Sequence, residues 1–510
     1  MAFASLQKGR VADARQLSDG LLATHVENAE VLFLASEVRL AEDDPEGALG
    51  FIEAAVAAAP GQWPLLLKQA ENLIMLRRRA QARQVAADAI AVAGNDGRAL
   101  WEIGKVYSRC DDPAGALPLY ERALAVMGRH PAFLYDLAVA RHHTGDSAGA
   151  EAILDALLNR APKFGHACYL RSTLRRQTDA RNHVRELEQR LAAGFPTADA
   201  RVACLFALAK EREDLGQDAA SFSALAEGAA LKRQNLTYDA AAERDAIDGI
   251  RKAYTQAVMQ TEVAGHEQGG AIFIVGMHRS GTSLMERMLG ANADVCAMGE
   301  TERLAAAVRY GADRFSEQIP DVALLAEVGQ INFDLIRQAF NTAAQKQTRG
   351  KRFVTEKTPG NFLNIGFIQR ALPNAKIVHM RREPVDLCFA NYRELLGKSL
   401  THANALDDLI HYHHGYENLL QHWQQIYPGR ILDVDYEQLV QYPEAQSQRV
   451  FEFCGLPWQP EMVDLTRRIS EPVSTLSSVQ VRQPVNTASI GRWRPYAQWL
   501  GDLTDQFGAN

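Results

Sequence analysis

Several features that would assign this chain to a common protein class are missing. Its six cysteines are scattered and include no Cys-x2-Cys pair, which argues against a zinc site or a disulfide framework and favours reduced, buried thiols. No apolar run reaches the length of a membrane span, and the first ten residues are too polar for a signal peptide. We therefore expect a soluble, cytoplasmic protein without a membrane-spanning segment.

An excess of positive charge is also missing. The formal net charge is −7, and no long basic run occurs among the 510 residues, so nothing in the composition attracts nucleic acid. A chain of this length is expected to form two or three domains with ample hydrophobic core.

The N-terminal half shows internal repetition. Segments that begin at residues 29, 63, 97 and 131 place leucines, small residues and alanines at equivalent positions, with a period of 34 residues. The equivalent residues are Leu32, Leu66, Leu100 and Leu134; Ser36, Ala70, Gly104 and Ala138; Ala48, Ala82, Ala116 and Ala150; and Ala55, Ala89 and Ala123. Small residues at such positions let two antiparallel helices approach closely. The pattern resembles the tetratricopeptide repeat, which implies an all-α solenoid over residues 1–235.

The repeat pattern weakens towards the middle of the chain. A degenerate unit begins near Gly165, and another helical pair runs from about Leu205 to Leu231. Repeat arrays commonly present a concave face to a peptide or a protein, so we expect a protein partner on the array. The alternative is an array that only packs against the rest of the chain or mediates dimerisation. Residues 236–268 are predicted to form a helical connector.

In the C-terminal half, strand-like runs alternate with helical patterns. These short apolar and β-branched runs occupy residues 272–275, 353–355, 376–380 and 431–434. The order predicts βαβ units and a parallel sheet, so residues 269–510 are expected to form an α/β, P-loop-like domain. Ligands then belong at the carboxyl ends of the strands.

The first of these runs leads into a glycine-bearing turn. Gly276 and Gly281 have the spacing of a phosphate-binding loop, and a helical pattern follows. Backbone amides and the helix dipole converge at such a turn and favour an anion. Thr282 stands where a Walker A motif needs lysine, whereas Arg279 supplies a cation inside the loop. The sequence therefore predicts a phosphate-binding turn and disfavours a nucleoside triphosphatase.

Six segments of this half resemble the sulfotransferase family, especially protein-tyrosine sulfotransferases and bacterial repeat-fused sulfotransferases. They are His278–Leu284, Met298–Thr301, Glu356–Pro359, Met380–Asp386, Val434–Leu439, and Ser477–Asn486 followed by Gly491–Trp493. One such motif is weak, but six in family order are difficult to obtain by chance. The resemblance covers roughly residues 270–495 and implies a sulfotransferase that uses 3′-phosphoadenosine 5′-phosphosulfate and no metal.

The resemblance assigns the 5′-phosphosulfate of this donor to the turn. Arg279 is expected to bind it, since positive charge placed in advance stabilises the charge spread over a transferred group. The neighbouring residues expected to contact the donor are Ser280, Gly281, Thr282, Ser283 and Leu284. The alternative for Arg279 is an ion pair with a carboxylate at the helix start.

Two further residues are assigned to catalysis. Lys357 is expected to stabilise the oxygen that leaves with the nucleotide, and an exposed lysine is the alternative. Glu300 is expected to be the general base for the acceptor hydroxyl, because it keeps the family's spacing from Arg279. Glu302 is close enough in sequence to compete for this role, and a salt-bridging or helix-capping carboxylate is the structural alternative for Glu300.

The 3′-phosphate is assigned to Arg382, whose planar guanidinium matches phosphate oxygens, with Arg381 as the alternative if the register is off by one. The serine that the family places eight residues later is Ala390 here. One 3′-phosphate hydrogen bond is therefore missing or comes from elsewhere, with Asn391 as the substitute considered.

Three more positions match the family near the nucleotide: Tyr436, Ser477 and Arg492. Tyr436 fits a core tyrosine equally well. Arg492 stands where tyrosine-directed enzymes carry lysine, and its alternative is a surface pair stacked with Trp493.

The leading hypothesis is a metal-independent sulfotransferase that moves a sulfuryl group from 3′-phosphoadenosine 5′-phosphosulfate to a hydroxyl of a peptide, a protein or a small molecule. Peptide tyrosine is one such acceptor. A P-loop kinase is the alternative enzyme, which the missing lysine disfavours. A repeat scaffold with an inactive transferase domain is the non-enzymatic alternative, supported by Ala390. The run His411–Gly415 resembles a metal site, but the His-Glu-x-x-His motif is absent and no nearby pattern of carboxylates and cysteines completes a site.

Overall fold

The computed structural model describes residues 2–42, 44–76, 78–128, 130–255, 270–314, 320, 322–348, 350–397, 400–465 and 484–508. These residues fall into two compact units, one up to Pro162 and the other from Lys163 onward. The first unit is all helical, and the second contains a parallel sheet. The fold class expected from the sequence is confirmed.

Antiparallel helix pairs build the first unit. The helices are α1 (Ala2–Gln7), α2 (Val11–Leu22), α3 (Ala29–Ala41), α4 (Pro45–Ala58), α5 (Trp63–Met75), α6 (Arg79–Ala93), α7 (Gly97–Arg109), α8 (Pro113–Met127), α9 (Pro131–His143) and α10 (Ser147–Arg160). Helices α3, α5, α7 and α9 begin at Ala29, Trp63, Gly97 and Pro131, where the 34-residue period places the repeat starts. The sequence period is therefore the structural period.

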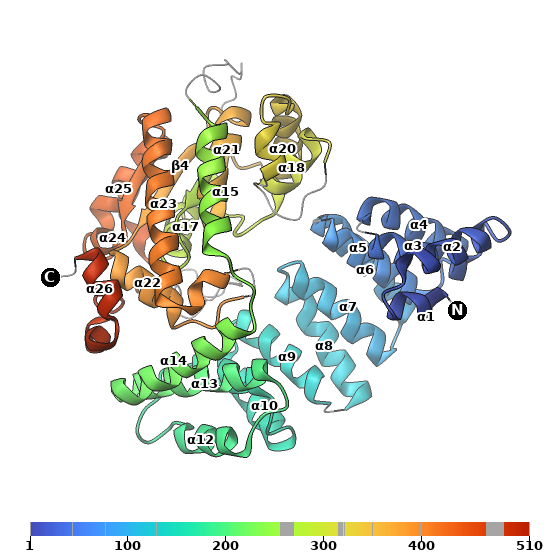
Figure 1. Ribbon diagram of the computed structural model, residues 1–510, viewed down its shortest axis with the longest axis horizontal. Helices are drawn as coiled ribbons and strands as arrows, with labels where there is room; N and C mark the ends of the chain where they lie inside the picture. The colour runs from blue at the N-terminus through green and yellow to red at the C-terminus, as the bar shows by residue number, and fades with distance from the viewer. Residues whose placement is uncertain are drawn as a thin grey trace. The chain divides into compact units, whose positions relative to one another are not determined.

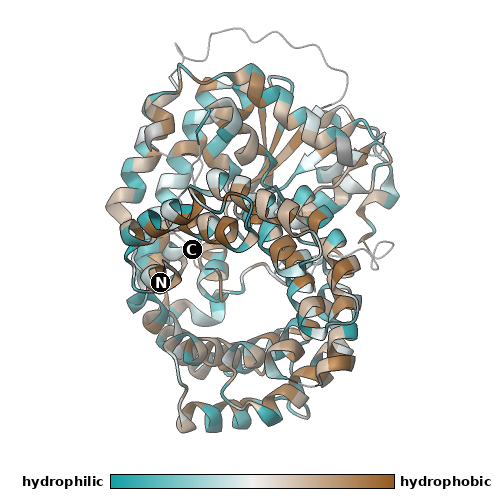
Figure 2. Cartoon of the chain, turned by 90° about the vertical axis from the view of Figure 1, so that its right-hand side faces the viewer, coloured by the Kyte–Doolittle hydropathy of each residue, from teal (hydrophilic) through white to brown (hydrophobic). Residues whose placement is uncertain are grey.

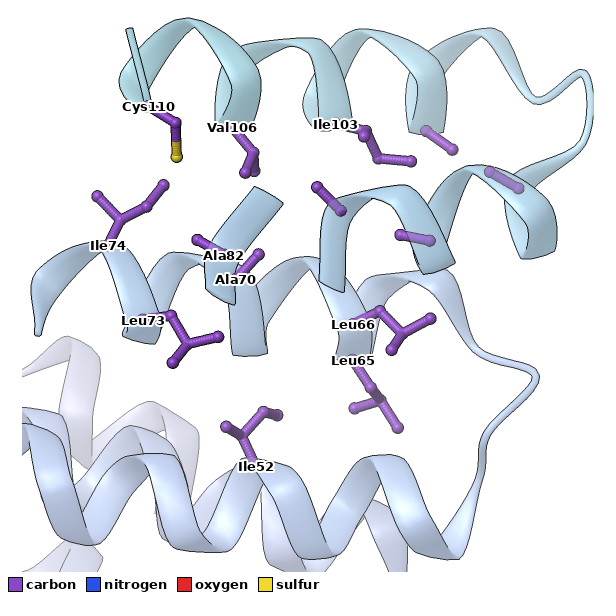
Figure 3. Packing of buried hydrophobic residues seen from close by; sticks show 14 of the residues in the cluster. Ile52, Leu65, Leu66, Ala70, Leu73, Ile74, Ala82, Ile103, Val106 and Cys110 are labelled. Carbon is purple, nitrogen blue, oxygen red and sulfur yellow. The ribbon is translucent and has the colours of Figure 1, made fainter. Parts of the chain in front are cut away.

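The small residues of the repeat lie where paired helices touch. Ala48, Ala70 and Ala82 are fully buried. At Gly104, an added Cβ would lie 2.6 Å from the ring of Tyr120, so the α7–α8 contact leaves no room for a larger residue. Figure 3 shows Ala70 and Ala82 between the larger apolar side chains of neighbouring helices. Close packing of this kind is sensitive to the addition of a single methyl group.

Aspartates cap the second helix of several repeats. Each accepts a hydrogen bond from the amide three residues later, at 2.8 to 2.9 Å. The pairs are Asp44–Gly47, Asp112–Gly115 and Asp146–Gly149. Such a cap satisfies an amide that has no partner within the helix and contributes about 1 kcal/mol.

Helices also open the second unit. They are α11 (Gly165–Thr173), α12 (Val184–Ala193), α13 (Ala198–Asp214), α14 (Asp218–Gln234) and α15 (Ala240–Ala253). Helices α13 and α14 form an antiparallel pair, in which Ser221 Oγ donates to the carbonyl of Ala209 at 2.7 Å. These helices, which the sequence analysis assigns to the repeat array and the connector, thus share a compact unit with the sheet.

The sheet has the order β2-β3-β1-β4-β5, and all its strands are parallel. The strands are β1 (Gly270–Val275), β2 (Val295–Cys296), β3 (Phe353–Glu356), β4 (Lys376–Arg381) and β5 (Ile431–Asp435). Four of them coincide with the predicted runs, and β2 adds a two-residue edge strand. In register, Ile272 pairs with Thr355 on one side and Lys376 on the other.

Helices cover both faces of the sheet. They are α17 (Thr282–Gly290), α18 (Arg303–Gly311), α19 (Val322–Ala326), α20 (Phe333–Thr348), α21 (Ile365–Ala371), α22 (Pro384–Tyr392), α23 (Leu406–Ile426), α24 (Tyr436–Gln441), α25 (Pro443–Cys454) and α26 (Gly501–Phe507). Short 3₁₀ turns are η1 (Pro359–Asn364), η2 (Thr401–Asn404), η3 (Pro460–Val463) and η6 (Arg494–Trp499). Figure 1 shows α15 beside α23, which it contacts.

Alternate residues of β1 enter the two hydrophobic layers. Ile272 and Ile274 join a core cluster with Met285 of α17 and Phe451 of α25. Phe273 packs instead on Phe340 of α20, at a ring distance of 5.7 Å. In Figure 2, the strands are coloured largely brown, the colour of hydrophobic residues. A strand buried on both faces is apolar throughout, which is why β1 was predictable from sequence.

Directly after α15, Tyr254 lies fully buried against Phe367 and Trp423, at ring distances of 5.6 and 5.5 Å. The helix before it therefore packs into the second unit. In the described part of the chain, no helix is both long and apolar enough to cross a bilayer.

Candidate active site

Chemically active side chains follow the carboxyl ends of all the described strands. Arg279 follows β1, Glu300 follows β2, Lys357 follows β3, Arg382 follows β4, and Tyr436 follows β5. The central strand β1 has β3 on one side and β4 on the other, so the chain crosses the sheet in opposite directions from this point. Ligands of open parallel sheets bind at such a switch point.

The turn after β1 is shaped by two glycines. Gly276 has φ +152°, and a Cβ there would lie 2.6 Å from the carbonyl oxygen of Met380. Gly281 has φ +103°, and a Cβ there would lie 2.6 Å from the ring of Tyr436. Arg279, between them, also has a positive φ of 70°. Only residues without a side chain fit these two positions at low cost, and the turn is correspondingly tight.

Polar groups of the turn lie at the start of α17. Ser280 is fully buried, and its Oγ has no hydrogen-bond partner among the described residues. Thr282 and Ser283 begin the helix, where backbone amides lack intrahelical acceptors and the helix dipole is positive. Leu284 packs against the apolar core instead. The turn thus has the features of a phosphate cradle.

The structure brings Lys357 and Glu300 together. Lys357 Nζ lies 2.5 Å from Glu300 Oε1. The backbone adds a second link, because the Lys357 amide donates to the Gly299 carbonyl at 3.0 Å. Glu302 lies at the N-cap of α18, and its side chain makes no capping hydrogen bond there. The cation and the carboxylate that the sequence analysis assigned to catalysis are thus direct neighbours.

A buried carboxylate that the sequence analysis missed holds the segment around Glu300. Glu286 of α17 accepts hydrogen bonds from the Gly299 amide at 2.8 Å and from Thr355 Oγ1 at 2.7 Å. The same threonine oxygen accepts from the Met298 amide at 3.2 Å. Charge-assisted hydrogen bonds of this kind fix the backbone that leads to Glu300.

A second buried carboxylate acts from the other side. Glu356 accepts from the Thr301 amide and from Thr358 Oγ1, each at 3.1 Å, and also from the Thr301 hydroxyl. Burial raises the pKa of Glu356 to about 7, against the effect of these hydrogen bonds. Glu300 therefore stands on a segment held at both neighbours, Gly299 and Thr301. The only sequence signal for Glu356 was its place directly before Lys357.

Arg279 does not point into open solvent. Its guanidinium lies 3.4 Å from Glu394 Oε1, and the two side chains are 10% and 16% exposed. The hydroxyl of Tyr169 donates to the other oxygen of Glu394 at 3.1 Å. The ion pair that the sequence analysis named as the alternative is thus present, and binding of a donor by Arg279 stays a prediction.

The structure places Arg382, rather than Arg381, beside the turn. Arg382 donates to the Arg279 carbonyl at 3.0 Å and to the Ser489 carbonyl at 2.6 Å, and its Nε has no partner among the described residues. Arg381 is about half exposed and lies 3.7 Å from Asp433. Arg382 therefore links the turn to the C-terminal segment and keeps one buried donor for a ligand.

Asn391 of α22 links the turn to its own helix. Its side-chain nitrogen donates to the His278 carbonyl and to the Leu387 carbonyl, both at 2.8 Å. An amide nitrogen carries two hydrogens, so no donor of Asn391 is left for a phosphate. Asn391 therefore does not replace the serine that is absent at Ala390.

The remaining predicted nucleotide residues differ in their placement. The ring of Tyr436 packs against Gly281 and lies beneath the Arg382 guanidinium, 4.9 Å from ring centre to Cζ. Arg492 donates to Glu213 Oε1 at 2.7 Å, so it forms an ion pair rather than a surface stack. Ser477 lies outside the described residues.

His278 lies within the turn, and the sequence analysis assigned it no role of its own. Burial lowers its pKa to about 4; the charge of Glu300 opposes this shift and that of Lys357 adds to it. A neutral imidazole thus lies near the Lys357–Glu300 pair at neutral pH. The only sequence signal for His278 was its place directly before Arg279 in the turn.

Both halves of the chain match models of known families. Residues 271–460 match the family model described as "Sulfotransferase family", and residues 111–171 match a tetratricopeptide repeat model. An uncharacterized protein of Aquifex aeolicus is 28% identical over 333 residues, which cover 62% of this chain and 43% of that protein. Among the described residues, no group of three or more His, Cys, Asp or Glu side chains is arranged to hold a metal ion.

Relatives whose names state an activity align with less of the chain. Protein-tyrosine sulfotransferase 2 of Gallus gallus is 28% identical over 236 residues, 44% of this chain and 62% of that protein. Protein-tyrosine sulfotransferase 1 of Homo sapiens is 26% identical over 244 residues, 45% of this chain and 65% of that protein. The chain thus spans about half of the length of the first two relatives, 43% and 62%. The sulfotransferase domain of a Synechococcus olefin synthase is 17% identical, with 49% of this chain and 99% of that chain covered and a TM-score of 0.34.

Proposed function

We propose that this chain, which carries tetratricopeptide repeats followed by a sulfotransferase-family domain, transfers a sulfuryl group from 3′-phosphoadenosine 5′-phosphosulfate to a hydroxyl acceptor. The observation that carries the proposal is the pairing of Lys357 with Glu300 at 2.5 Å, at the carboxyl edge of the sheet. A buried cation and an accessible carboxylate at one point suit a reaction in which a hydroxyl loses a proton while negative charge develops nearby.

The residues present fit an anionic nucleotide. Gly276 and Gly281 leave no room for a side chain and let the backbone of the turn approach a ligand closely, and Ser280 Oγ and Arg382 Nε are buried donors without a partner among the described residues. We assign the 5′-phosphosulfate end to the turn and the 3′-phosphate end to Arg382, because a planar guanidinium suits phosphate oxygens. When bound, the donor supplies an activated sulfuryl group on a phosphate leaving group.

Glu300 is assigned the proton transfer. Its Oε1 is occupied by Lys357, whereas Oε2 accepts no hydrogen bond from the described residues, and the side chain is 48% exposed. Oε2 can therefore take the acceptor's hydroxyl proton as the acceptor oxygen bonds to sulfur. The bond from sulfur to the 5′-phosphate oxygen breaks, and the electron pair leaves with 3′-phosphoadenosine 5′-phosphate. Lys357 stabilises the charge on that leaving oxygen.

The acceptor is proposed as a peptide or protein hydroxyl, with tyrosine first. Similarity to protein-tyrosine sulfotransferases supports tyrosine, and a repeat array can hold an extended peptide. A small-molecule hydroxyl is the alternative acceptor, since acceptor pockets depend on loops rather than on the fold.

The test is transfer of label from radiolabelled donor to a panel of acceptors, in a metal chelator. The panel contains an acidic tyrosine peptide, its phenylalanine counterpart and a small phenol. The proposal expects labelled acceptor and free 3′-phosphoadenosine 5′-phosphate in equal amounts, with loss of both in Lys357→Met. Lys351→Met, which changes an exposed lysine in front of β3, serves as the matched control. Nucleotide binding without any transfer to acceptors in a whole-cell lysate would refute the proposal.

One observation favours a second candidate, a repeat scaffold with an inactive transferase domain. The Arg279 guanidinium faces Glu394, so an incoming donor has to compete with a carboxylate. Calorimetric titration with 3′-phosphoadenosine 5′-phosphate separates the two candidates. An intact fold that binds no nucleotide favours the scaffold, and saturable binding favours the transferase.

A further inference from the structure

The segment after α22 is held by helices that the sequence analysis placed in the repeat array. Tyr169 of α11 donates its hydroxyl hydrogen to Glu394 Oε2 at 3.1 Å. The same hydroxyl oxygen accepts from the Leu395 amide at 3.1 Å. From α14, Lys232 Nζ donates to the Leu396 carbonyl at 2.6 Å. Both side chain and backbone of the segment 394–396 are thus fixed by these helices.

A second contact comes from α13. Oε1 of Glu213 lies 2.6 Å from Arg393 and 2.7 Å from Arg492, so one carboxylate oxygen joins two arginines. Glu213 and Arg393 are each 15% exposed. Burial alone would raise the pKa of Glu213, but the two guanidinium groups outweigh it and lower the pKa. The carboxylate is therefore charged at neutral pH and binds both arginines at once.

These contacts lead directly to the turn. Glu394, which Tyr169 holds by one oxygen, has its other oxygen 3.4 Å from the Arg279 guanidinium. Arg393 and Glu394 are adjacent in the chain, so Glu213 and Tyr169 fix neighbouring side chains of one short segment. Arg279 in the turn and Arg492 in the C-terminal segment are thereby oriented by groups that lie outside the α/β fold.

We propose that Tyr169 and Glu213 are positioning residues of the donor site, and that the helices α11 and α13 complete that site rather than act as an appendage. Tyr169 acts through Glu394 on Arg279, and Glu213 acts through shared ion pairs on Arg393 and Arg492. This inference rests on the proposed function for the identity of the donor. The positioning itself is a property of the turn, which can be measured without a reaction.

Two variants of the 510-residue chain test the proposal. Tyr169→Phe removes one hydroxyl and leaves the charge unchanged, and Glu213→Gln removes the shared counter-charge. Tyr120→Phe is the matched control for the first, because Tyr120 also hydrogen-bonds a neighbouring side chain, Ser108, at 2.9 Å. Glu186→Gln is the matched control for the second, because Glu186 also pairs with two arginines, Arg171 and Arg190.

Amide hydrogen exchange of the peptide covering residues 276–284 is the first readout. We expect exchange there to become several-fold faster in Tyr169→Phe and Glu213→Gln, and unchanged in the two controls. The second readout is the Kd for 3′-phosphoadenosine 5′-phosphate. We expect it to rise about ten-fold in Tyr169→Phe, the size of one lost hydrogen bond to a charged group.

Glu213→Gln distinguishes an effect of positioning on nucleotide affinity from an effect of net charge, because the two have opposite signs. Loss of a negative charge near an anion site would by itself tighten nucleotide binding, whereas loss of positioning weakens it. Tighter or unchanged binding in Glu213→Gln, together with unchanged exchange of the turn in both variants, would overturn the proposal. If the wild-type chain binds no nucleotide, the proposed function fails, and the exchange measurement still decides whether Tyr169 and Glu213 position the turn. If one variant does not fold, the hydrogen exchange of the turn and the Kd are both measured on the other variant.

Discussion

The ammonium group of Lys357 lies 2.5 Å from a carboxylate oxygen of Glu300, although the two side chains differ greatly in exposure. Lys357 is 1% exposed, whereas Glu300 is 48% exposed. The pair thus connects a buried cation at the end of β3 with a carboxylate that an acceptor can reach. In the proposed reaction, the lysine faces the leaving group and the glutamate faces the incoming hydroxyl.

Glu300→Gln is expected to lower kcat by about 10²–10⁴-fold, because the variant cannot take the acceptor's proton. The KM for the donor should change little, since Glu300 is assigned no contact with the nucleotide. Steady-state kinetics with both substrates varied provides the measurement. Glu302→Gln is the control, because it changes the neighbouring carboxylate at the N-cap of α18. A larger loss in Glu302→Gln than in Glu300→Gln would reverse the assignment.

Arg382→Lys is expected to weaken binding of 3′-phosphoadenosine 5′-phosphate about ten-fold or more, because lysine cannot bind the Arg279 and Ser489 carbonyls and also offer the donor that Nε provides. Arg381→Lys is the control one position earlier, where the side chain is about half exposed. Calorimetric titration of the two variants compares them directly. Equal losses in both variants would show that the 3′-phosphate is held elsewhere.

Gly281→Ala is expected to abolish nucleotide binding while most of the fold persists. The new Cβ would lie 2.6 Å from the Tyr436 ring, at a residue whose φ of +103° disfavours any side chain. Gly360→Ala is the control, because a Cβ at that position meets no atom within 4 Å. Circular dichroism and titration of both variants test this. Wild-type affinity in Gly281→Ala would mean that the turn does not need its tight geometry.

Glu356 is expected to make stability depend on pH. Its pKa in the folded chain is about 7, above the ordinary glutamate value, so the folded state binds an extra proton between about pH 4.5 and 7. The stability that this proton provides is complete below pH 4.5 and is lost as the pH rises through 7, an effect of about 3 kcal/mol. Glu356→Gln should remove this part of the slope in urea unfolding between pH 5 and 8. Glu452→Gln, which changes an exposed glutamate, should keep the pH dependence of the wild-type chain. A wild-type slope in Glu356→Gln would show that Glu356 does not cause the pH dependence.

Gly104→Ala is expected to lower the free energy of unfolding of the repeat helices by about 1–3 kcal/mol, through overpacking against Tyr120. Gly50→Ala, inside the repeat helix α4 and with no atom within 4 Å of the new Cβ, should instead stabilise by about 0.5–1 kcal/mol. Urea unfolding of the two variants measures the difference. The same sign of effect in both would show that the α7–α8 contact is looser than described.

The repeats and the sheet were predictable because their signals are local. A 34-residue period set by small residues places helix starts at Ala29 and Trp63, and apolar β-branched runs mark the buried strands. The strand β2 has only two residues, Val295–Cys296, too few for any pattern to stand out. The positions of Arg279 and Lys357 at strand ends followed from the resemblance together with the rule for parallel sheets, whereas Glu300 was chosen by its spacing from Arg279 alone.

The support of the site was not predictable because it depends on contacts between distant residues. Tyr169 and Glu394 are separated by 225 residues in the sequence, and Glu286 meets Thr355 across 69. In the sequence, a glutamate that will be buried cannot be told from an exposed one, because the groups that donate hydrogen bonds to it come from distant segments. The pairing of Arg279 with Glu394 is of the same kind, since the sequence offers no register that connects the turn to the end of α22.

Single-turnover transfer from radiolabelled 3′-phosphoadenosine 5′-phosphosulfate to an acidic tyrosine peptide, in a metal chelator, compares the wild-type chain with Lys357→Met and Lys351→Met. Sulfuryl transfer at the Lys357–Glu300 pair predicts stoichiometric labelling of tyrosine by wild type and by Lys351→Met, and a loss of at least about 10²-fold in Lys357→Met. Labelling at the wild-type rate by Lys357→Met would contradict it.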